Sequence, residues 1–176
     1  TIRPERNYRR IFMDPKPRIA TVVLPFRGEF VLLGRKQGKP EIGVGTLNGG
    51  GGKMEPPDKT IRDCAVREML EEFGIIIDPT KLVKVAIITF YAAGAPNMEV
   101  HFYTTDTFSG EPRETESMIP EWHHRDKVPY ERMLESDPHW FPGIFRGEKF
   151  RTNVYYREKA KGYIGMDPFL PLDDLD

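Results

Sequence analysis

The stretch REMLEEFG, residues 67–74, places three carboxylates within five positions of one another, just before a glycine. On a helix of 3.6 residues per turn, Glu68 and Glu72 lie one turn apart on the same face, with Glu71 beside them. Like charges at this spacing repel each other by roughly 0.2–0.5 kcal/mol per pair on a helix surface. The cluster therefore indicates that something outside the helix offsets the repulsion.

The helix that carries this cluster is predicted over residues 60–74. Thr60 can cap its start, and Gly74 can adopt the left-handed conformation that ends it. The apolar residues recur at i,i+4 spacing, and this stripe consists of Ile61, Ala65, Met69 and Phe73, widened by Val66 and Leu70. Because the acidic stripe runs beside the apolar one, we expect the carboxylates at the border of the buried face, where partial desolvation strengthens their repulsion.

Two explanations of the acidic cluster are open at this point. A divalent cation turns the repulsion into attraction, and Mg²⁺ prefers oxygen ligands, usually one or two carboxylates together with waters and substrate phosphates. The alternative is a solvated charged face with Arg62 and Arg67 as partners. The segment GGGGK, residues 49–53, lies upstream in a Gly- and Pro-rich stretch of residues 37–59. Glycines let backbone approach a ligand closely, so a glycine-rich loop followed by an acidic helix favours a site in which the loop and a metal bind the same phosphate chain. The other interpretation of the glycines is a flexible surface linker.

The sequence around this unit predicts more strands than helices. A hairpin is expected at 18–26 and 29–36, and further strands at 82–92, 99–108 and 117–124, the last at a sheet edge because of its proline. A short helix is expected at 128–136, an aromatic segment at 139–145, an irregular tail at 165–176 and an N-terminal arm at 1–17. One strong helix among strands predicts a mixed α/β sandwich rather than a regular parallel βαβ array.

Length and composition are those of an ordinary globular protein. The 176 residues suggest one domain, which we place at 18–176, and 26 basic against 27 acidic side chains give a net charge of −1. Such a balance gives no general reason to expect a stable complex with nucleic acid. The single cysteine, Cys64, excludes an internal disulfide and fits the reducing cytoplasm, and no apolar run approaches the roughly 18 residues that cross a bilayer. We therefore expect a cytoplasmic protein without a membrane partner, either a monomer or a homodimer.

Residues 51–75 resemble the Nudix box, G-x5-E-x7-R-E-U-x-E-E-x-G-U, in which U is a bulky aliphatic residue. The positions that match in spacing are Arg67, Glu68, Met69, Glu71, Glu72, Gly74 and Ile75. The resemblance implies an α/β/α sandwich with a mixed, curved β-sheet. It also implies a loop–helix–loop that binds Mg²⁺, or alternatively Mn²⁺, and hydrolyses a nucleoside diphosphate linked to another group. The residues it assigns are Gly52, Glu68, Glu71 and Glu72 as metal ligands, with Arg67, Glu68, Glu71 and Glu72 in catalysis.

One departure from the box concerns its first glutamate. When the box is aligned without gaps, Lys59 occupies the position of this glutamate and Lys53 occupies the position of the first glycine. A one-residue insertion in EPPDK would restore Gly52 and bring Asp58 near the place of the glutamate, which in the family orients the box arginine. Two outcomes are open: Asp58 orients Arg67 through its shorter side chain, or Arg67 lacks this partner and activity falls.

Further stretches within residues 18–145 match a narrower group, namely VLLGRK, LNGGGGK, CAVREMLEEFG, MEVHFYTTD, MIPEW at 118–122, VPYERM and WFP at 140–142. Through them the chain resembles the MutT-type hydrolases of oxidised purine nucleoside triphosphates. The similarity implies that Asn48 and Asp137 read the purine edge. Three positions depart from the pattern: Leu134 stands at the place of a stacking tryptophan, Ser136 at that of a second aspartate, and Ser117 at that of a further glutamate, with Glu116 next to it. These departures put the base specificity in doubt and leave the phosphate chemistry intact.

The sequence thus predicts a Mg²⁺-dependent pyrophosphohydrolase that acts on a modified purine nucleoside triphosphate, with 8-oxo-dGTP as a candidate. The expected substrate-binding residues are Asn48, Gly51, Gly52, Lys53, Asp137 and Trp140, and Glu71 or Glu116 is expected to accept the proton of the attacking water. Two alternatives are a catalytically silent Nudix-fold module that binds a nucleotide or a protein, and a nucleic-acid-binding or decapping protein that uses the arginines of residues 1–17.

Overall fold

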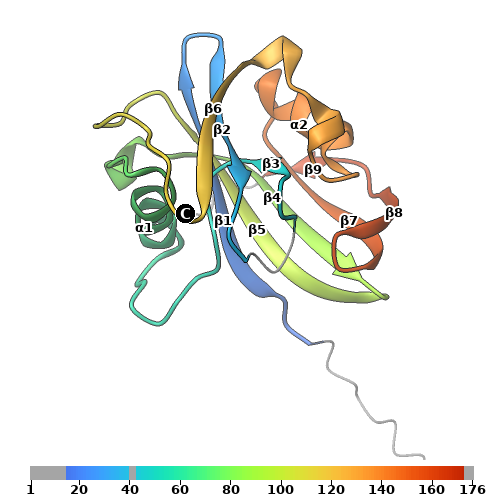
Figure 1. Ribbon diagram of the computed structural model, residues 1–176. Coiled ribbons are helices and arrows are strands. Elements are labelled where there is room, and N and C mark those ends of the chain that lie inside the picture. Colours follow the sequence, from blue (N-terminus) through green and yellow to red (C-terminus); the bar gives the residue numbers. More distant parts are fainter. Residues whose placement is uncertain (1–14, 40–42, 173–176) are drawn as a thin grey trace, which may run out of the picture.

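The computed structural model describes residues 15–39 and 43–172, so the arm expected at 1–17 falls outside it apart from residues 15–17. Figure 1 shows a curved sheet with a helix on each side. The strands are β1 (Arg18–Arg27), β2 (Phe30–Lys36), β3 (Leu47–Asn48), β4 (Val83–Ala92), β5 (Ala95–Thr105), β6 (Met118–His124), β7 (Phe150–Glu158), β8 (Lys161–Met166) and β9 (Leu170–Pro171). The helices are α1 (Ile61–Phe73) and α2 (Asp137–Phe145), with short 3₁₀ turns at Pro79–Lys81, Arg125–Lys127 and Tyr130–Arg132.

The described strands form one mixed sheet. Its order is β3-β2-β1-β5-β4-β7-β8, with β6 paired to β2 and β9 to β7. The pairs β1–β5 and β4–β7 are parallel and the others antiparallel. This architecture confirms the predicted α/β fold with a mixed, curved sheet. Among the described strands, β6 pairs only with β2, which confirms the prediction that β6 lies at an edge.

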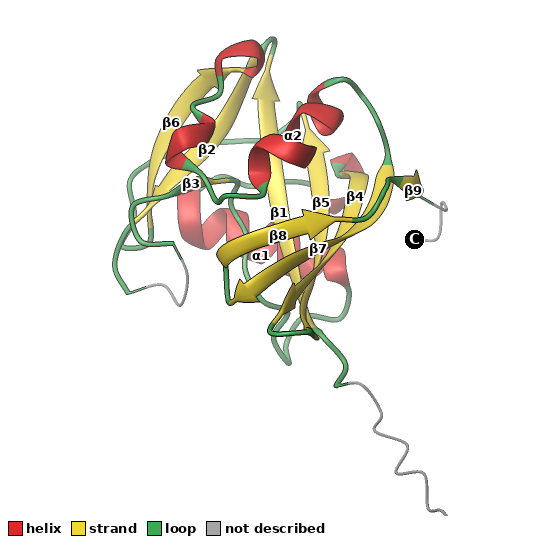
Figure 2. Ribbon diagram, turned by 90° about the vertical axis from the view of Figure 1, so that its right-hand side faces the viewer, coloured by secondary structure: helices red, strands yellow, loops and turns green. Residues whose placement is uncertain are grey.

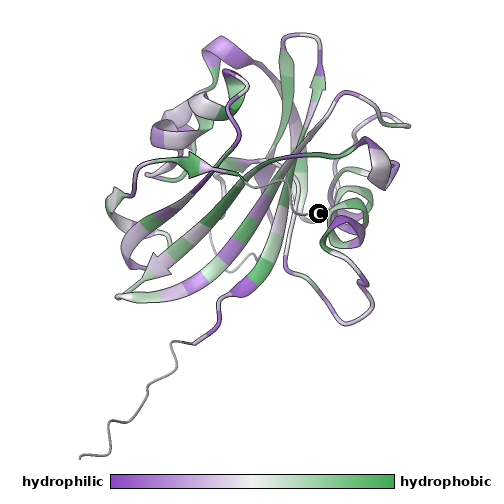
Figure 3. Ribbon diagram, turned by 180° about the vertical axis from the view of Figure 1, so that it is seen from behind, coloured by the Kyte–Doolittle hydropathy of each residue, from purple (hydrophilic) through white to green (hydrophobic). Residues whose placement is uncertain are grey.

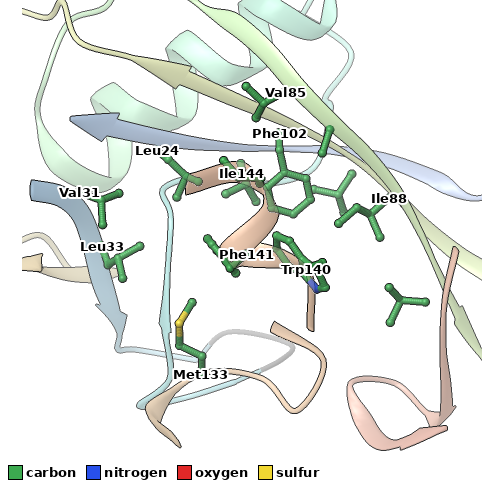
Figure 4. Packing of buried hydrophobic residues seen from close by; sticks show 14 of the residues in the cluster. Leu24, Val31, Leu33, Val85, Ile88, Phe102, Met133, Trp140, Phe141 and Ile144 are labelled. Atoms are coloured by element: carbon green, nitrogen blue, oxygen red, sulfur yellow. The ribbon is translucent and has the colours of Figure 1, made fainter. Parts of the chain in front are cut away.

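Both faces of the sheet are buried, because the central strands carry apolar side chains at odd and at even positions. In β1, Val22 and Leu24 belong to the core under α2, whereas Val23 belongs to the core under α1. Likewise Phe102 and Tyr103 of β5 point to opposite faces. Figure 2 shows α2, β7 and β8 in front of the sheet and α1 behind it. Figure 4 shows the α2-side core, in which Trp140, Phe141 and Ile144 of α2 pack against Leu24, Val31, Leu33 and Phe102 of the strands.

The helix α1 begins and ends where the sequence predicts. Thr60 and Asp63 form a reciprocal capping box, and Gly74 ends the helix with φ 70°. Ala65, Met69 and Phe73 are buried against the sheet, as expected from the stripe. Leu70, expected to widen it, is 49% exposed. Figure 3 shows the apolar face of α1 turned to the sheet and its polar face turned outward.

The hairpin of β1 and β2 is confirmed, but its strands stay paired only next to the turn, at Phe26–Val31 and Arg27–Phe30. Beyond that point β2 pairs with β6 and β3, and β1 pairs with β5 on its other side. The splayed hairpin leaves one edge of β1 open for the glycine-rich loop. Isolated bridges join Val23 to Gly50 and Ala20 to Lys53 along this edge.

Two expectations for the C-terminal third are wrong, and not all of its strands were predicted. The helix expected at 128–136 is reduced to the 3₁₀ turn Tyr130–Arg132, and the second helix is α2, which includes the aromatic segment 139–145. The tail expected to be irregular from residue 165 contains the end of β8 and the short β9. Strand β7 was not predicted, although the buried alternation of Phe150, Thr152, Val154 and Tyr156 is a period-two signal. No helix in the described ranges is long and apolar enough to span a membrane.

Candidate active site

The glycine-rich loop lies flat against β1 through main-chain hydrogen bonds. Val23 donates its N–H to the Gly50 carbonyl at 2.7 Å, and Thr21 donates to the Gly52 carbonyl at 2.9 Å. A Cβ on Gly51 would stand 1.8 Å from the Thr21 carbonyl oxygen, and one on Gly52 would stand 2.5 Å from the Glu68 carboxylate. Close approach of backbone to β1 and α1 therefore requires glycines here, which excludes a flexible surface linker as the explanation of GGGGK.

Two glutamates of α1 face this loop, because Glu68 and Glu72 lie on one side of the helix and the loop passes over it. The Glu72 carboxylate accepts a hydrogen bond of 2.7 Å from the Gly51 N–H, and Glu68 is 8% exposed against Gly52. Burial raises the pKa of Glu68, and burial also raises the pKa of Glu72 to about 7, with the neighbouring Glu68 adding to the effect. The border position inferred from the helical stripes is confirmed, and it is a position at which a cation would be favourable.

Glu71 lies apart from this pair. Its side chain is 57% exposed and accepts a hydrogen bond of 3.2 Å from Arg67 Nη1. The same nitrogen donates to Glu68 Oε1 at 2.8 Å. Arg67 thus offsets part of the repulsion among the glutamates, which is the role that the solvated-face explanation gave it. The same explanation named Arg62 as a second partner, but Arg62 donates to the main-chain carbonyls of Pro79 and Leu82.

Asp58 orients Arg67, which is the first of the two outcomes that the sequence left open. Arg67 Nε donates to Asp58 Oδ1 at 3.0 Å, and Nη2 donates to Asp58 Oδ2 at 2.9 Å, a bidentate pair. Hydrogen bonds from Arg67 hold the pKa of Asp58 below its ordinary value, and the carboxylate in turn raises the pKa of Arg67. Arg67 Nη2 also donates to the Lys53 carbonyl at 3.1 Å, so the arginine joins the helix to the loop.

We expect Asp58→Ala to lower the free energy of unfolding by about 1–3 kcal/mol, because Arg67 loses a charged partner whose side chain is only 4% exposed. Urea denaturation at neutral pH measures this loss. Lys59→Ala is the matched control, since Lys59 is the adjacent exposed residue on which the first glutamate of the box falls. An equal loss in both variants would show that Asp58 has no special role.

The loop and the helix open onto a cavity of about 610 Å³, a size typical of small-molecule sites. Among the expected site residues, the cavity is lined by Asn48, Gly51, Gly52, Lys53, Glu68, Glu72, Glu116, Asp137 and Trp140. Glu71 and Arg67 are not part of this lining. Glu71 lies instead in an adjoining depression whose wall Glu116 shares.

The cavity lining also includes one buried carboxyl group from the start of α2, together with many apolar side chains. Asp137, at the start of α2, is 2% exposed and accepts a hydrogen bond of 3.2 Å from the Leu134 N–H. Burial raises the pKa of Asp137 to about 7. The apolar part of the lining consists of Phe90, Tyr91, Met98, Val100, Phe102, Leu134, Trp140, Tyr156 and Ala160. Such a lining suits a flat, mostly apolar group with a few polar edge atoms.

The side chains of Trp140 and Ser136 are engaged in contacts with each other and with neighbouring residues. The indole of Trp140 is 2% exposed and stacks on Phe141 with a centroid distance of 4.2 Å and an interplanar angle of 22°. Its Nε1–H donates to Ser136 Oγ at 3.3 Å, so the serine hydroxyl is turned toward α2, and Ser136 is absent from the cavity lining. Leu134 does line the cavity. Trp140 therefore forms a wall of the cavity and has one ring face covered by Phe141.

Lys36 is a site residue that the sequence reasoning missed. It ends β2, lines the cavity and is half-buried, and burial lowers the pKa of its ammonium group while Glu72 and Asp137 raise it. Lys36 thus lies close enough to both Glu72 and Asp137 to interact with them. The two basic residues that end the apolar run of β2, Arg35 and Lys36, were the available signal.

The oxygen-rich surroundings fit a hard divalent cation. Glu68 and Glu72 both line the cavity beside the glycine loop, and carboxylate oxygens are ligands that Mg²⁺ accepts. The Gly52 carbonyl, which the sequence predicts as a further ligand, accepts hydrogen bonds from the Thr21 N–H and the Cys64 thiol. Within residues 15–39 and 43–172, no three His, Cys, Asp or Glu side chains already converge as an ion site. The reason is visible in the contacts, because Glu68 and Glu71 accept from Arg67 and Glu72 accepts from Gly51. A bound cation would replace these hydrogen bonds.

Comparisons with known proteins agree with this geometry. The family model described as NUDIX domain matches residues 14–144. The chain is 40% identical over 143 residues to an oxidized purine nucleoside triphosphate hydrolase of Mus musculus, covering 81% of this chain and 88% of the mouse protein. It is 38% identical over 134 residues to a protein of the same name from Danio rerio, covering 76% and 83%. The fold is similar to that of the Mutator MutT protein from Bacillus halodurans, with a TM-score of 0.71, 20% identity and coverage of 85% of this chain and 96% of that one.

Proposed function

The chain belongs to the Nudix family, and we propose on this basis that it hydrolyses a purine nucleoside triphosphate with a modified base to the nucleoside monophosphate and pyrophosphate. The observation that carries the proposal is one cavity whose lining combines two chemically different sets of residues. Glu68, Glu72 and the glycine loop form a polar set suited to phosphates and a cation, here called the phosphate end, and Asp137 with the apolar lining forms the other, here called the base end. A nucleoside triphosphate has the same division between its phosphate chain and its base.

Each end has its own task. Glu68 and Glu72 would hold Mg²⁺ or Mn²⁺, which, when bound, lowers the pKa of a coordinated water and neutralises charge on phosphate oxygens. The ammonium groups of Lys36 and Lys53 line the cavity and would attract the phosphate chain. Arg67, held by Asp58, fixes the loop to α1 and so keeps the two sides of the phosphate site in place.

The proton of the attacking water needs an acceptor. Glu116 lines the cavity directly, whereas Glu71 is bonded to Arg67 and lies in the adjoining depression. Both carboxylates remain candidates, and the kcat of Glu71→Gln and Glu116→Gln on the same substrate separates them, because the acceptor's variant loses turnover and the other keeps most of it.

The base end favours a purine whose edge offers both hydrogen-bond donors and acceptors. Asn48 and Asp137 are the polar groups that would read this edge. A carboxyl whose pKa lies near 7 can accept or donate, which suits an oxidised purine such as that of 8-oxo-dGTP. Leu134 supplies an apolar contact in place of an aromatic one. Stacking of bases on aromatic side chains contributes about 1–3 kcal/mol each, so we expect weaker binding than an aromatic residue at this position would give.

A panel of normal and oxidised nucleoside triphosphates tests the proposal. We expect pyrophosphate release in the presence of Mg²⁺, loss of release on chelation, and the highest kcat/KM on an oxidised purine. Product analysis by chromatography distinguishes pyrophosphate from inorganic phosphate. Nucleotide binding without any turnover across the panel would favour the catalytically silent module instead.

A further inference from the structure

The hairpin of β7 and β8 closes the base end of the cavity. Tyr156 of β7 and Ala160 of its turn both line the cavity. The turn bends sharply, with positive φ angles at Ala160 (54°) and Gly162 (70°). This hairpin follows residue 144, the last residue that the NUDIX domain model matches. The position of the hairpin tip therefore bears on the width of the base end.

Glu135 connects this hairpin to the segment that precedes α2. Its Oε1 accepts a hydrogen bond of 3.2 Å from the Gly162 N–H, and its Oε2 accepts one of 2.9 Å from the Tyr163 N–H. These two hydrogen bonds, the one from Tyr163 first, hold the pKa of Glu135 below its ordinary value. The carboxylate is exposed, so its effect is on the position of β8 and not on the burial of a core.

Two further contacts join the same two parts of the chain. The rings of His139 and Tyr163 stack with a centroid distance of 4.8 Å and an interplanar angle of 20°. The Tyr156 hydroxyl accepts a hydrogen bond of 2.9 Å from the Ser136 N–H. The segment 134–139 thus carries Leu134 and Asp137, which line the cavity, and at the same time holds the hairpin that forms the facing wall.

We propose that Glu135 is a positioning residue for substrate selection, which holds the β7–β8 hairpin against the segment 134–139 and so fixes the width of the base end. The inference rests on the proposed function, since it assumes that a nucleobase occupies this end. The glycine loop, Glu68 and Glu72 have no contact with Glu135 among the described interactions. Loosening the hairpin therefore weakens binding of the base and leaves the phosphate chemistry unchanged.

The test compares Glu135→Ala with Glu135→Gln, and with Glu131→Ala as a control at a nearby exposed glutamate. If the hairpin is closed in only a fraction of molecules, apparent affinity falls by that fraction. We expect KM for the preferred nucleoside triphosphate to rise about threefold to tenfold in Glu135→Ala, with kcat within twofold of wild type. Glu135→Gln, which keeps one acceptor oxygen, should lie between the two, and Glu131→Ala should match wild type.

Amide hydrogen exchange gives a readout that does not depend on turnover. Exchange over residues 159–165 should become faster in Glu135→Ala and stay unchanged in Glu131→Ala. Faster exchange with an unaltered KM would overturn the proposal and leave Glu135 a purely structural residue, as would a fall in kcat at constant KM. Absence of turnover in the wild-type protein would refute the proposed function instead, so the two failures are distinguishable.

Discussion

Glu72→Gln is expected to lower kcat by about 10²–10⁴-fold while the fold is retained. A cation at a phosphoryl oxygen supplies several kcal/mol of charge stabilisation, and each 1.36 kcal/mol corresponds to a factor of ten in rate. The neutral amide is a poor ligand for Mg²⁺ but can still accept the hydrogen bond from the Gly51 N–H through its oxygen. Pyrophosphate release at saturating substrate and Mg²⁺ measures the effect.

The stability of the same variant separates loss of chemistry from loss of structure. Because burial raises the pKa of Glu72 to about 7, its ionisation costs folding free energy above that pH. The melting temperature of Glu72→Gln at pH 8 in the presence of a chelator should therefore equal or exceed that of the wild type. Glu158→Gln, an exposed glutamate at the end of β7, is the control and should leave both rate and stability unchanged. Equal rates in wild type and Glu72→Gln would show that Glu72 holds no metal.

Asp137→Asn is expected to lower kcat/KM for the preferred substrate by about 10–100-fold, because a site built to pair with polar atoms of a base loses one of its partners. A second consequence concerns pH. Burial raises the pKa of Asp137 to about 7 from 3.8, so the folded protein binds a proton that the unfolded chain releases. Stability due to this group is fully present below pH 4 and is lost as the pH rises through 7, by roughly 2–4 kcal/mol.

Urea denaturation from pH 4 to pH 8 measures this slope. The wild type should lose stability over that interval, and the loss should be smaller in Asp137→Asn, whose side chain does not titrate. Asp106→Asn, at an exposed aspartate in the loop after β5, should keep the wild-type slope. The assignment of Asp137 as a buried proton-binding group is wrong if all three proteins give the same profile.

Helix α1 and the glycine-rich loop before it could be predicted from the sequence, because the residues that determine them are close together in the chain. Helix α1 carries its own cap at Thr60, its own stop at Gly74 and a period of four, and the structure agrees at each point. The glycines of 49–53 were predicted to let backbone approach a ligand, and the close approach that the structure shows is to β1 and α1. Asp58 was one candidate to replace the first glutamate of the box, and its bidentate pair with Arg67 confirms this outcome.

The C-terminal third was less accessible, because its elements depend on tertiary packing. Helix α2 contains Pro142 in its interior, which argues against a helix locally, whereas Pro138 lies in the first turn, where proline is tolerated. The helix forms because Trp140, Phe141 and Ile144 are buried against the sheet. Leu70 shows the reverse effect, since the helical stripe predicted burial but, within the described residues, its side chain is 49% exposed.

The site residues likewise divide into those that a local sequence pattern indicated and those that only tertiary packing brings together. The acidic cluster is contiguous in sequence and was found, whereas Lys36, Tyr156 and Ala160 reach the cavity from separate strands and a turn. Ser136 aligns with a base-reading position by resemblance, but its hydroxyl accepts from Trp140, which no local pattern indicates. Site residues that only the folding of the sheet brings together could be identified from the structure but not from the sequence.

Calorimetric titration of Mg²⁺ into the protein saturated with a non-hydrolysable nucleoside triphosphate analogue tests the central claim most directly. Wild type should bind Mg²⁺ with a measurable heat, and Glu68→Gln and Glu72→Gln should each weaken this binding at least tenfold while still binding the analogue. Identical Mg²⁺ affinity in wild type and both variants would contradict the claim that these two carboxylates hold the cation.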